Sequence, residues 1–324
     1  MKFSTFQESV RSASRFKGRG AHQAITPMLG LAGETGSILN VYKKYLRDRI
    51  DLEAHRDLIG EELGDALWYV AAIANILGLD LEEIAKANLG RAEDLYGGGI
   101  ESASLSSLPV FDAGYPESER FPRSLTVEFS QEVNERGLPT VSMTLIEAIP
   151  DAFPNGSNVT QVDGKKIELG YQVGSQLGDP LDDNTDVADA YRFHDAIHFG
   201  FLSVLNWSPN SRSLLKIKRR SNADVDRTQD GARAIFAEEG LATILSRLAR
   251  RRMGLTKEVN IDGEIIEIAR ASVADLEVSD LPGWAWRRAI SQGFQAMHHL
   301  AENQGGYLVA DLDARTLGYW RFRP

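Results

Sequence analysis

The sequence predicts a mainly α-helical protein in two parts: an N-terminal all-α helical bundle, then an α+β C-terminal domain with a small antiparallel sheet and several helices. Three observations indicate this. Apolar residues recur at helical spacing through the first hundred residues, β-favouring residues cluster after residue 122, and helical spacing returns after about residue 187. We expect a helical domain at 1–99, a linker at 100–121 and the C-terminal domain at 122–324.

Helical runs make up the N-terminal block between about residues 4 and 96. Apolar side chains follow each other at steps of three and four from Ile25 to Leu46, and again from Leu58 to Leu77. A break at Gly78-Leu79-Asp80 separates these runs from a later helix. Asp80 is a suitable cap for that helix, because its carboxylate can accept from the free N–H groups of the first turn.

The segment 100–121 is rich in Ser, Pro and Gly and has no helical period, which predicts a linker. The next segments, Ser124–Gln131 and Thr140–Glu147, favour strands and flank a turn-like sequence. Lys165–Val173 is a possible third strand. We therefore expect a small antiparallel sheet here.

The second helical region runs from about Val187 to Leu300, with a break at Trp207-Ser208-Pro209. The pair Asp262-Gly263 favours a tight turn, so a hairpin is possible at Glu258–Glu267.

Composition excludes several classes of protein. The 324 residues carry a net charge of −10, which argues against bulk nucleic-acid binding. There is no cysteine, so disulfides, thiolate metal sites and cysteine nucleophiles are excluded. No signal-peptide core and no run of about 18 apolar residues occurs. We expect a cytoplasmic protein without a membrane span.

Three acidic residues are candidate ligands for a cation. Glu62 and Asp65 are three residues apart and share one helix face, and Glu34 lies on another predicted helix. Carboxylates within apolar helical stretches are costly unless paired or bound to a cation, although such acids also occur on solvated helix surfaces. Oxygen ligands suit Mg²⁺. Trp68 and Tyr69, which follow, are expected to pack in the core rather than stack on a base.

The sequences GLAGETGSILNVYKK and EELGDALWYV resemble the MazG-like all-α nucleoside triphosphate pyrophosphohydrolases, over about Phe6 to Tyr96. The family signature is Glu-x-x-Glu, a gap, then Glu-x-x-Asp. The resemblance implies catalysis and metal binding by Glu34, Glu62 and Asp65 with Mg²⁺, or with Mn²⁺ as the alternative ion.

The activity implied is hydrolysis of an NTP or dNTP between the α- and β-phosphates to a nucleoside monophosphate and pyrophosphate. The resemblance also implies a homo-oligomer, either a dimer or a tetramer. The candidate contacts to the nucleotide are Lys43, Lys44 and Arg47, which a solvated basic face would equally explain, and Asn88 and Arg91, which match a family position.

One position departs from the signature, because Ser37 replaces the second Glu of the first pair. The loss removes one charge and one ligand, which could weaken metal affinity, change the number of metals or abolish turnover. Glu61 is the nearest spare carboxylate, but it points about 100° away from Glu62 on a helix. The alternative is therefore a nucleotide-sensing regulatory module with weak or no turnover that controls the C-terminal domain. A third hypothesis makes the C-terminal half the principal catalyst.

A second candidate site lies in the C-terminal half, where His194 and His198 share one helix face at a spacing common among metal ligands. A structural role for this pair is an equal alternative. The other candidates are nearby charged residues: Arg192, Asp195, Lys218, Arg219, Arg220, Asp230, Arg233, Glu238 and Glu239. The segment resembles the C-terminal region attached to some MazG-like proteins and predicts a phosphate or nucleotide site, with metal possible.

Overall fold

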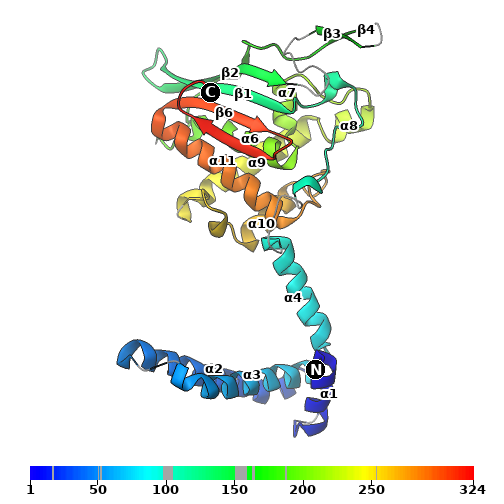
Figure 1. Ribbon diagram of the computed structural model, residues 1–324, viewed down its shortest axis with the longest axis vertical. Coiled ribbons are helices and arrows are strands. Elements are labelled where there is room, and N and C mark those ends of the chain that lie inside the picture. The colour runs from blue at the N-terminus through cyan, green and yellow to red at the C-terminus, as the bar shows by residue number, and fades with distance from the viewer. Residues whose placement is uncertain are drawn as a thin grey trace. The chain divides into compact units, whose positions relative to one another are not determined.

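The computed structural model describes residues 1–16, 18–49, 51, 53–97, 105–149, 159–162, 165–186, 188–252 and 254–324. The chain divides into two compact units, Met1–Glu93 and Asp94–Pro324 (Figure 1). The described residues of the first unit form helices and their connections. The second unit combines helices with an antiparallel sheet, so the predicted fold class is confirmed.

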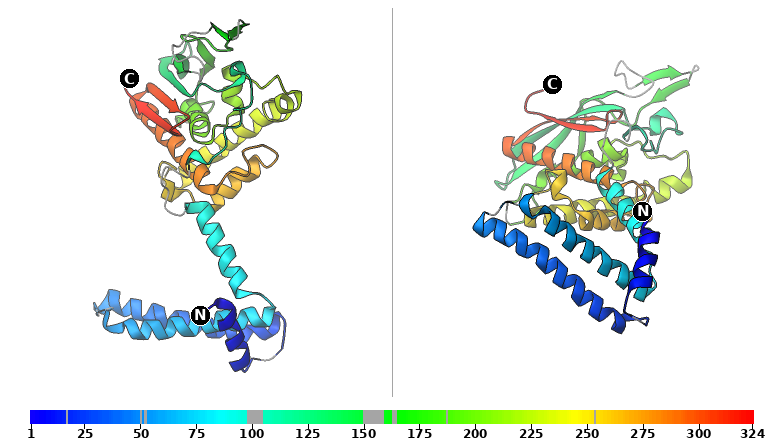
Figure 2. Two further views of the ribbon diagram at one scale, coloured as in Figure 1. Left: turned by 45° about the vertical axis from the view of Figure 1, so that its right-hand side comes forward. Right: turned by 60° about the horizontal axis from the view of Figure 1, so that its bottom comes forward.

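The first unit is built on a pair of long helices. Its elements are α1 (Phe3–Ala13), α2 (Ala21–Asp48), the short 3₁₀ helix η1 (Glu53–His55), α3 (Arg56–Leu77) and the first part of α4 (Leu81–Tyr96). Helices α2 and α3 lie side by side (Figure 2, right). Gly78 ends α3 in the left-handed conformation at φ 71°. The Asp80 carboxylate accepts from the N–H groups of Glu82 and Glu83 at 2.8 and 3.1 Å, so the expected cap is confirmed.

The core of the first unit is small. Val10, Ala71, Ala72 and Leu81 are buried in it, and Trp68 packs against them. The Tyr69 ring lies against Gly30 of α2, where a Cβ atom would come within 2.3 Å of the ring. Gly30 therefore lets α2 and α3 approach closely. The expected core packing is confirmed for Trp68, whereas the half-buried Tyr69 packs against Gly30 at the contact between the helices.

Much of the apolar surface of α2 and α3 remains exposed. The large exposed side chains on these helices include Ile25, Met28, Leu29, Leu39, Tyr42, Leu46, Leu58, Leu63 and Leu67. Among the described residues, no single helix is long and apolar enough to cross a membrane, although Glu53–Leu77 and Leu81–Tyr96 meet the length and composition requirement as a pair bent by 110°.

The second unit contains a five-stranded antiparallel sheet. The strands are β1 (Ser124–Val133), β2 (Pro139–Ile149), β5 (Gln176–Leu181), β6 (Gly305–Asp311) and β7 (Thr316–Trp320), in the spatial order β5-β2-β1-β6-β7. The short strands β3 (Val159–Val162) and β4 (Lys165–Glu168) form a separate pair. The first two predicted strands are confirmed, whereas the third ends at Glu168 rather than Val173.

Helix α6 (Asp195–Leu205) occupies the centre of this unit, and all of its residues are buried. Phe199 and Leu202 join the core beneath the sheet, whereas Phe201 and Leu205 join a second core among the helices. Gly200 meets Gly293 of α11 (Gly283–Asn303), where a Cβ atom on either residue would lie within 3 Å of the partner backbone. A helix that is apolar all round requires such burial.

The remaining helices complete the second unit. They are α7 (Pro209–Leu214), α8 (Ala223–Thr228), α9 (Ala232–Arg251) and α10 (Gly263–Ser272), with the 3₁₀ helices η2 (Glu117–Glu119), η3 (Tyr191–Phe193) and η4 (Glu258–Asn260). The expected hairpin at Glu258–Glu267 is wrong. The Asp262 carboxylate accepts from the Ile265 N–H at 3.1 Å and so begins α10 as its N-cap.

The segment expected as a linker, 100–121, lies partly outside the described residues. Its described part packs into the second unit, because Leu108 and Phe121 are buried in the two cores. Asp112 accepts from the Phe121 N–H and from the Arg212 guanidinium, both at 2.8 Å. These contacts fasten the segment to the domain that follows it.

Candidate metal and nucleotide site

Three carboxylates meet on the facing helices of the first unit. Glu34 comes from α2, and Glu62 and Asp65 come from successive turns of α3. One oxygen from each lies within 4.8 Å of the other two. Glu34 and Glu62 are half-buried and Asp65 is exposed. The structure therefore brings together the three residues that the sequence singles out, at distances that one divalent cation can bridge.

Like charges dominate the electrostatics of this group. A hydrogen bond to Glu34 raises the pKa of Glu62 above its ordinary value. Burial and the negative charges of Glu34 and Asp65 add to the shift. The crowding of negative charge therefore disfavours the ionised form of Glu62 when no cation balances it. A bound Mg²⁺ would balance these charges, and the hard oxygen donors fit it.

Ser37 lies one turn after Glu34 on the same helix and is half-buried. It offers a neutral hydroxyl where the family signature has a carboxylate. Glu61 is exposed on α3, and its charge contributes the least to the pKa of Glu62 among the acids around it. The acidic group among the described residues therefore has three members.

The predicted substrate contacts are basic or polar residues outside this group. Lys43 and Lys44 are exposed on α2, about 14 Å along the helix axis from Glu34. Arg47 pairs with the neighbouring Asp48 at 2.5 Å. Asn88 and Arg91 are exposed on α4. No contact among the described residues joins any of the five to the carboxylates, so their role stays a prediction.

The candidates for the second site separate into different clusters. His194, which caps α6, and Asp195 and His198 within α6 lie close to Glu238 and Glu239 of α9. Arg192 is nearby but pairs with Asp183 at 2.8 Å. The exposed Arg233 pairs with Asp275 at 3.0 Å.

The basic run 218–220 does not form one patch. Arg219 is buried and donates from every guanidinium nitrogen, to Asp230, Glu277 and the Phe111 carbonyl. Lys218 is half-buried and Arg220 is exposed. Arg219 and Asp230 thus form a buried ion pair, and the expectation that Arg219 meets phosphate is wrong, because its donors are already used.

Sequence reasoning missed Asn210, whose side chain touches both Glu239 and His198. It follows Ser208-Pro209, a signal for a helix start, where Ser208 accepts from the Ser211 N–H. That signal places a helix but does not indicate its partner, since Glu238 and Glu239 lie nearly thirty residues further along the chain.

Three carboxylates that converge from two adjacent helices are an arrangement typical of proteins that bind a divalent cation through oxygen ligands. Comparison with known families makes this more specific. Residues 23–93 match the MazG nucleotide pyrophosphohydrolase domain, and residues 141–323 match the MazG C-terminal domain. The chain therefore belongs to the MazG family and carries a nucleotide pyrophosphohydrolase domain.

One similar protein is the Gene 37 protein of Mycobacterium phage L5. It is 32% identical over 110 residues, which are 32% of this chain and 96% of the phage protein. No solved structure matches the chain.

Proposed function

We propose that the first unit hydrolyses an NTP or dNTP between the α- and β-phosphates, releasing a nucleoside monophosphate and pyrophosphate. The observation that carries the proposal is the meeting of Glu34, Glu62 and Asp65 within 4.8 Å on two helices. Mg²⁺, or Mn²⁺ in its place, is the cation that these oxygens would hold.

The cation would lower the pKa of a bound water and balance charge on the phosphates. The three carboxylates fix its position, and each must be ionised to do so. Because its neighbours raise the pKa of Glu62, binding of the cation is expected to weaken as the pH falls. Lys43, Lys44, Arg47, Asn88 and Arg91 remain the candidate contacts to the nucleotide.

We also propose that the first unit acts as a homo-oligomer, either a dimer or a tetramer. The exposed apolar side chains of α2 and α3, of which Leu46 at 75% and Leu29 at 69% are examples, support this proposal. Light scattering on the purified chain tests it. Leu29→Glu and Leu46→Glu together should give a monomer, and an unchanged mass would contradict this interface.

The alternative is a nucleotide sensor with weak or no turnover that regulates the C-terminal domain. The neutral Ser37 supports it, since three carboxylates hold a cation less tightly than four. Such a module would bind a nucleotide in the presence of Mg²⁺ and release no pyrophosphate.

The test is pyrophosphate release from a panel of NTPs and dNTPs with Mg²⁺ or Mn²⁺. Glu62→Gln should lower turnover by more than about 100-fold. Replacing a residue that only orients a metal ligand costs about 10- to 100-fold, and replacing a ligand itself should cost more. Glu61→Gln is the matched control and should keep the activity. Binding without release in the unchanged chain would favour the sensor. Activity that survives Glu62→Gln and disappears in His194→Gln would move catalysis to the second unit.

A further inference from the structure

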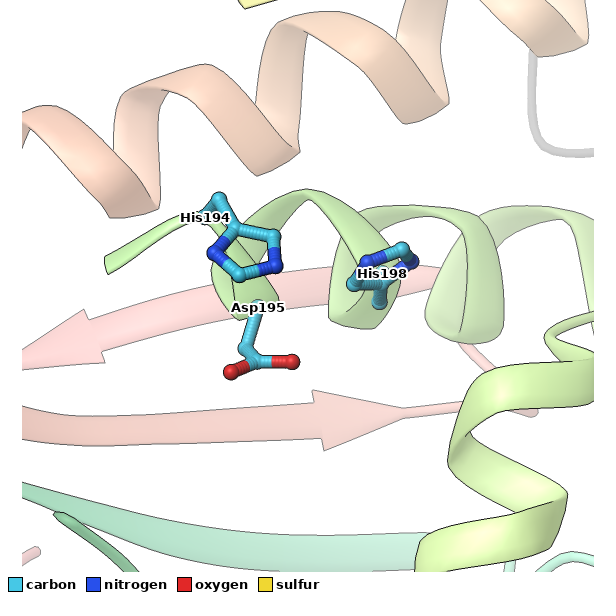
Figure 3. Close-up of side chains that lie close together, drawn as sticks. All are labelled: His194, Asp195 and His198. Carbon is cyan, nitrogen blue, oxygen red and sulfur yellow. The ribbon is translucent and has the colours of Figure 1, made fainter. Parts of the chain in front are cut away.

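Two histidines and two carboxylates converge in the second unit, apart from the carboxylates of the first unit. His194 precedes the first residue of α6 and His198 lies one turn later. Both are buried, at 7% and 2% exposure. Figure 3 shows both rings along α6 with the Asp195 carboxylate near His194. One donor atom from each of these three residues lies within 4.8 Å of the other two.

Hydrogen bonds fix how both imidazole rings face. The His194 Nδ1 lies 2.9 Å from the Tyr191 carbonyl oxygen, which can only accept, so Nδ1 carries the proton. The His198 Nδ1 lies 2.8 Å from the Glu238 Oε1 and donates to it. Ligating histidines hold their second nitrogen in this way. Each ring is therefore able to present its Nε2 lone pair.

Both Nε2 atoms face the same oxygen. The Glu239 Oε2 lies 3.4 Å from the His194 Nε2 and 3.5 Å from the His198 Nε2. These distances exceed the usual N–H···O length of about 2.9 Å. Two ligands bound about 2.1 Å from one tetrahedral ion lie about 3.4 Å apart. The spacing is therefore that of ligands around a shared ion.

Asp195 supplies a second, independent observation. It is 5% exposed, and no hydrogen bond or ion pair to its carboxylate occurs within the described ranges. A buried carboxylate without a direct partner is costly to charge. A cation between the histidines would offset that cost.

Residues behind this group hold it in place. Glu238 is fully buried and also accepts from the Ser208 hydroxyl at 2.7 Å and the Asn210 N–H at 2.8 Å. The Asn210 side-chain amide donates to the Glu239 Oε1, which leaves Oε2 for the histidines. The Glu239 side chain is 37% exposed, so an ion and its water can reach the group from solvent.

We propose that His194, Asp195, His198 and Glu239 bind one divalent transition-metal ion, with Glu238 and Asn210 as positioning residues. Two imidazole nitrogens and two carboxylates favour an ion such as Zn²⁺ over Mg²⁺, which prefers oxygen ligands. The chain would then hold two metals of different chemistry, one in each unit.

The experiment uses the full chain carrying Glu62→Gln, so that the first unit contributes no complete site. After chelator treatment and dialysis, the protein is titrated with Co²⁺ while visible absorption is recorded, and then with Zn²⁺ in competition. Bound zinc is counted by elemental analysis. Absorption by nitrogen-ligated, low-coordinate Co²⁺ distinguishes this site from carboxylate oxygens alone.

We expect one ion per chain and displacement of Co²⁺ by Zn²⁺. Glu239→Gln and His194→Gln should abolish the absorption, and Glu238→Gln should weaken affinity by about 10- to 100-fold. Glu239 is partly exposed, so its variant should fold, which circular dichroism checks. His298→Gln is the matched control, since His298 is exposed and faces Glu302 at 3.3 Å. No bound ion, or binding unchanged in Glu239→Gln and His194→Gln, would leave a metal-free ion-pair cluster and overturn the proposal.

Discussion

The carboxylates of the first unit and the histidine cluster of the second are supported in opposite ways. Glu34, Glu62 and Asp65 stand on a two-helix framework, partly in solvent, and repel one another. His198 is enclosed on a helix that is buried along its whole length and is hydrogen-bonded to a buried carboxylate. The charges of the first arrangement are partly exposed to solvent and have no hydrogen-bonded framework around them among the described residues, whereas the surrounding protein sets the geometry of the second.

The difference follows from how much apolar surface each unit buries. The first unit has a small core and exposes large apolar residues on α2 and α3. The second surrounds α6 with two cores. A buried polar cluster requires such surroundings, because hydrogen bonds to fixed partners must replace those to water.

The largest effect is expected from Phe201→Ala in α6. Phe201 is fully buried, with Trp207 and Trp286 at ring distances of 6.3 and 5.8 Å. Its truncation should lower the free energy of unfolding of the second unit by about 3–5 kcal/mol. Tryptophan fluorescence during urea unfolding measures this. The control Phe236→Ala, at a 76% exposed position, should change it by less than about 0.5 kcal/mol, and equal losses would contradict the central role of α6.

Gly30→Ala tests the close approach of α2 and α3. The new methyl group would overlap the Tyr69 ring and push the helices apart, at a cost of about 1–3 kcal/mol. Because Glu34 lies one turn after Gly30, Mg²⁺ binding should weaken as well. Calorimetric titration with Mg²⁺ measures the affinity. Gly33→Ala meets nothing within 4 Å and should leave the affinity unchanged; the same loss in both variants would exclude the helix contact as the cause.

Ser37→Glu would complete the acidic set of the first unit. A fourth carboxylate should lower the Mg²⁺ concentration needed for half-maximal binding by about 10-fold, because the affinity for Mg²⁺ rises with the negative charge of the ligands. Ser37→Gln controls for size without charge. If both variants bind Mg²⁺ as the unchanged chain does, the side chain at 37 does not reach the cation.

The smallest effect concerns pH and Glu62. Its pKa is raised in the folded state, so its protonated form stabilises the first unit at pH values below the ordinary glutamate pKa. That contribution is lost as the pH rises through the raised value. Unfolding curves without metal should show this loss, and saturating Mg²⁺ or Glu62→Gln should remove it. A pH dependence that persists in Glu62→Gln would assign it to other groups.

Helical spacing places Glu62 and Asp65 on one face of a helix, and Glu34 lies on the preceding long apolar run. The resemblance to MazG-like proteins joins the three acids in one set, and the contact between the two helices brings them together. Asn88 and Arg91 are exposed on α4. Helical spacing alone does not predict whether they contact a nucleotide.

Long-range pairing explains what sequence could not predict. The pair Asp262-Gly263 is compatible with a tight turn and with the start of a helix. The helix forms because it buries Ile265 and Ile266 in the core. Strand β6 follows α11 after the single residue Gln304 and pairs with β1 about 180 residues earlier. Glu238 meets His198 across forty residues. Each depends on tertiary packing rather than on a local pattern.

The strand order has a consequence for synthesis on the ribosome. Strand β1 lies between β2 and β6, and β6 begins only at Gly305. While the chain is being made, one edge of β1 has to wait for nearly all of the second unit to be translated. An exposed strand edge invites pairing with other chains. Nascent chains that stop before residue 305 should therefore be prone to aggregation, even though the N-terminal helices are already complete.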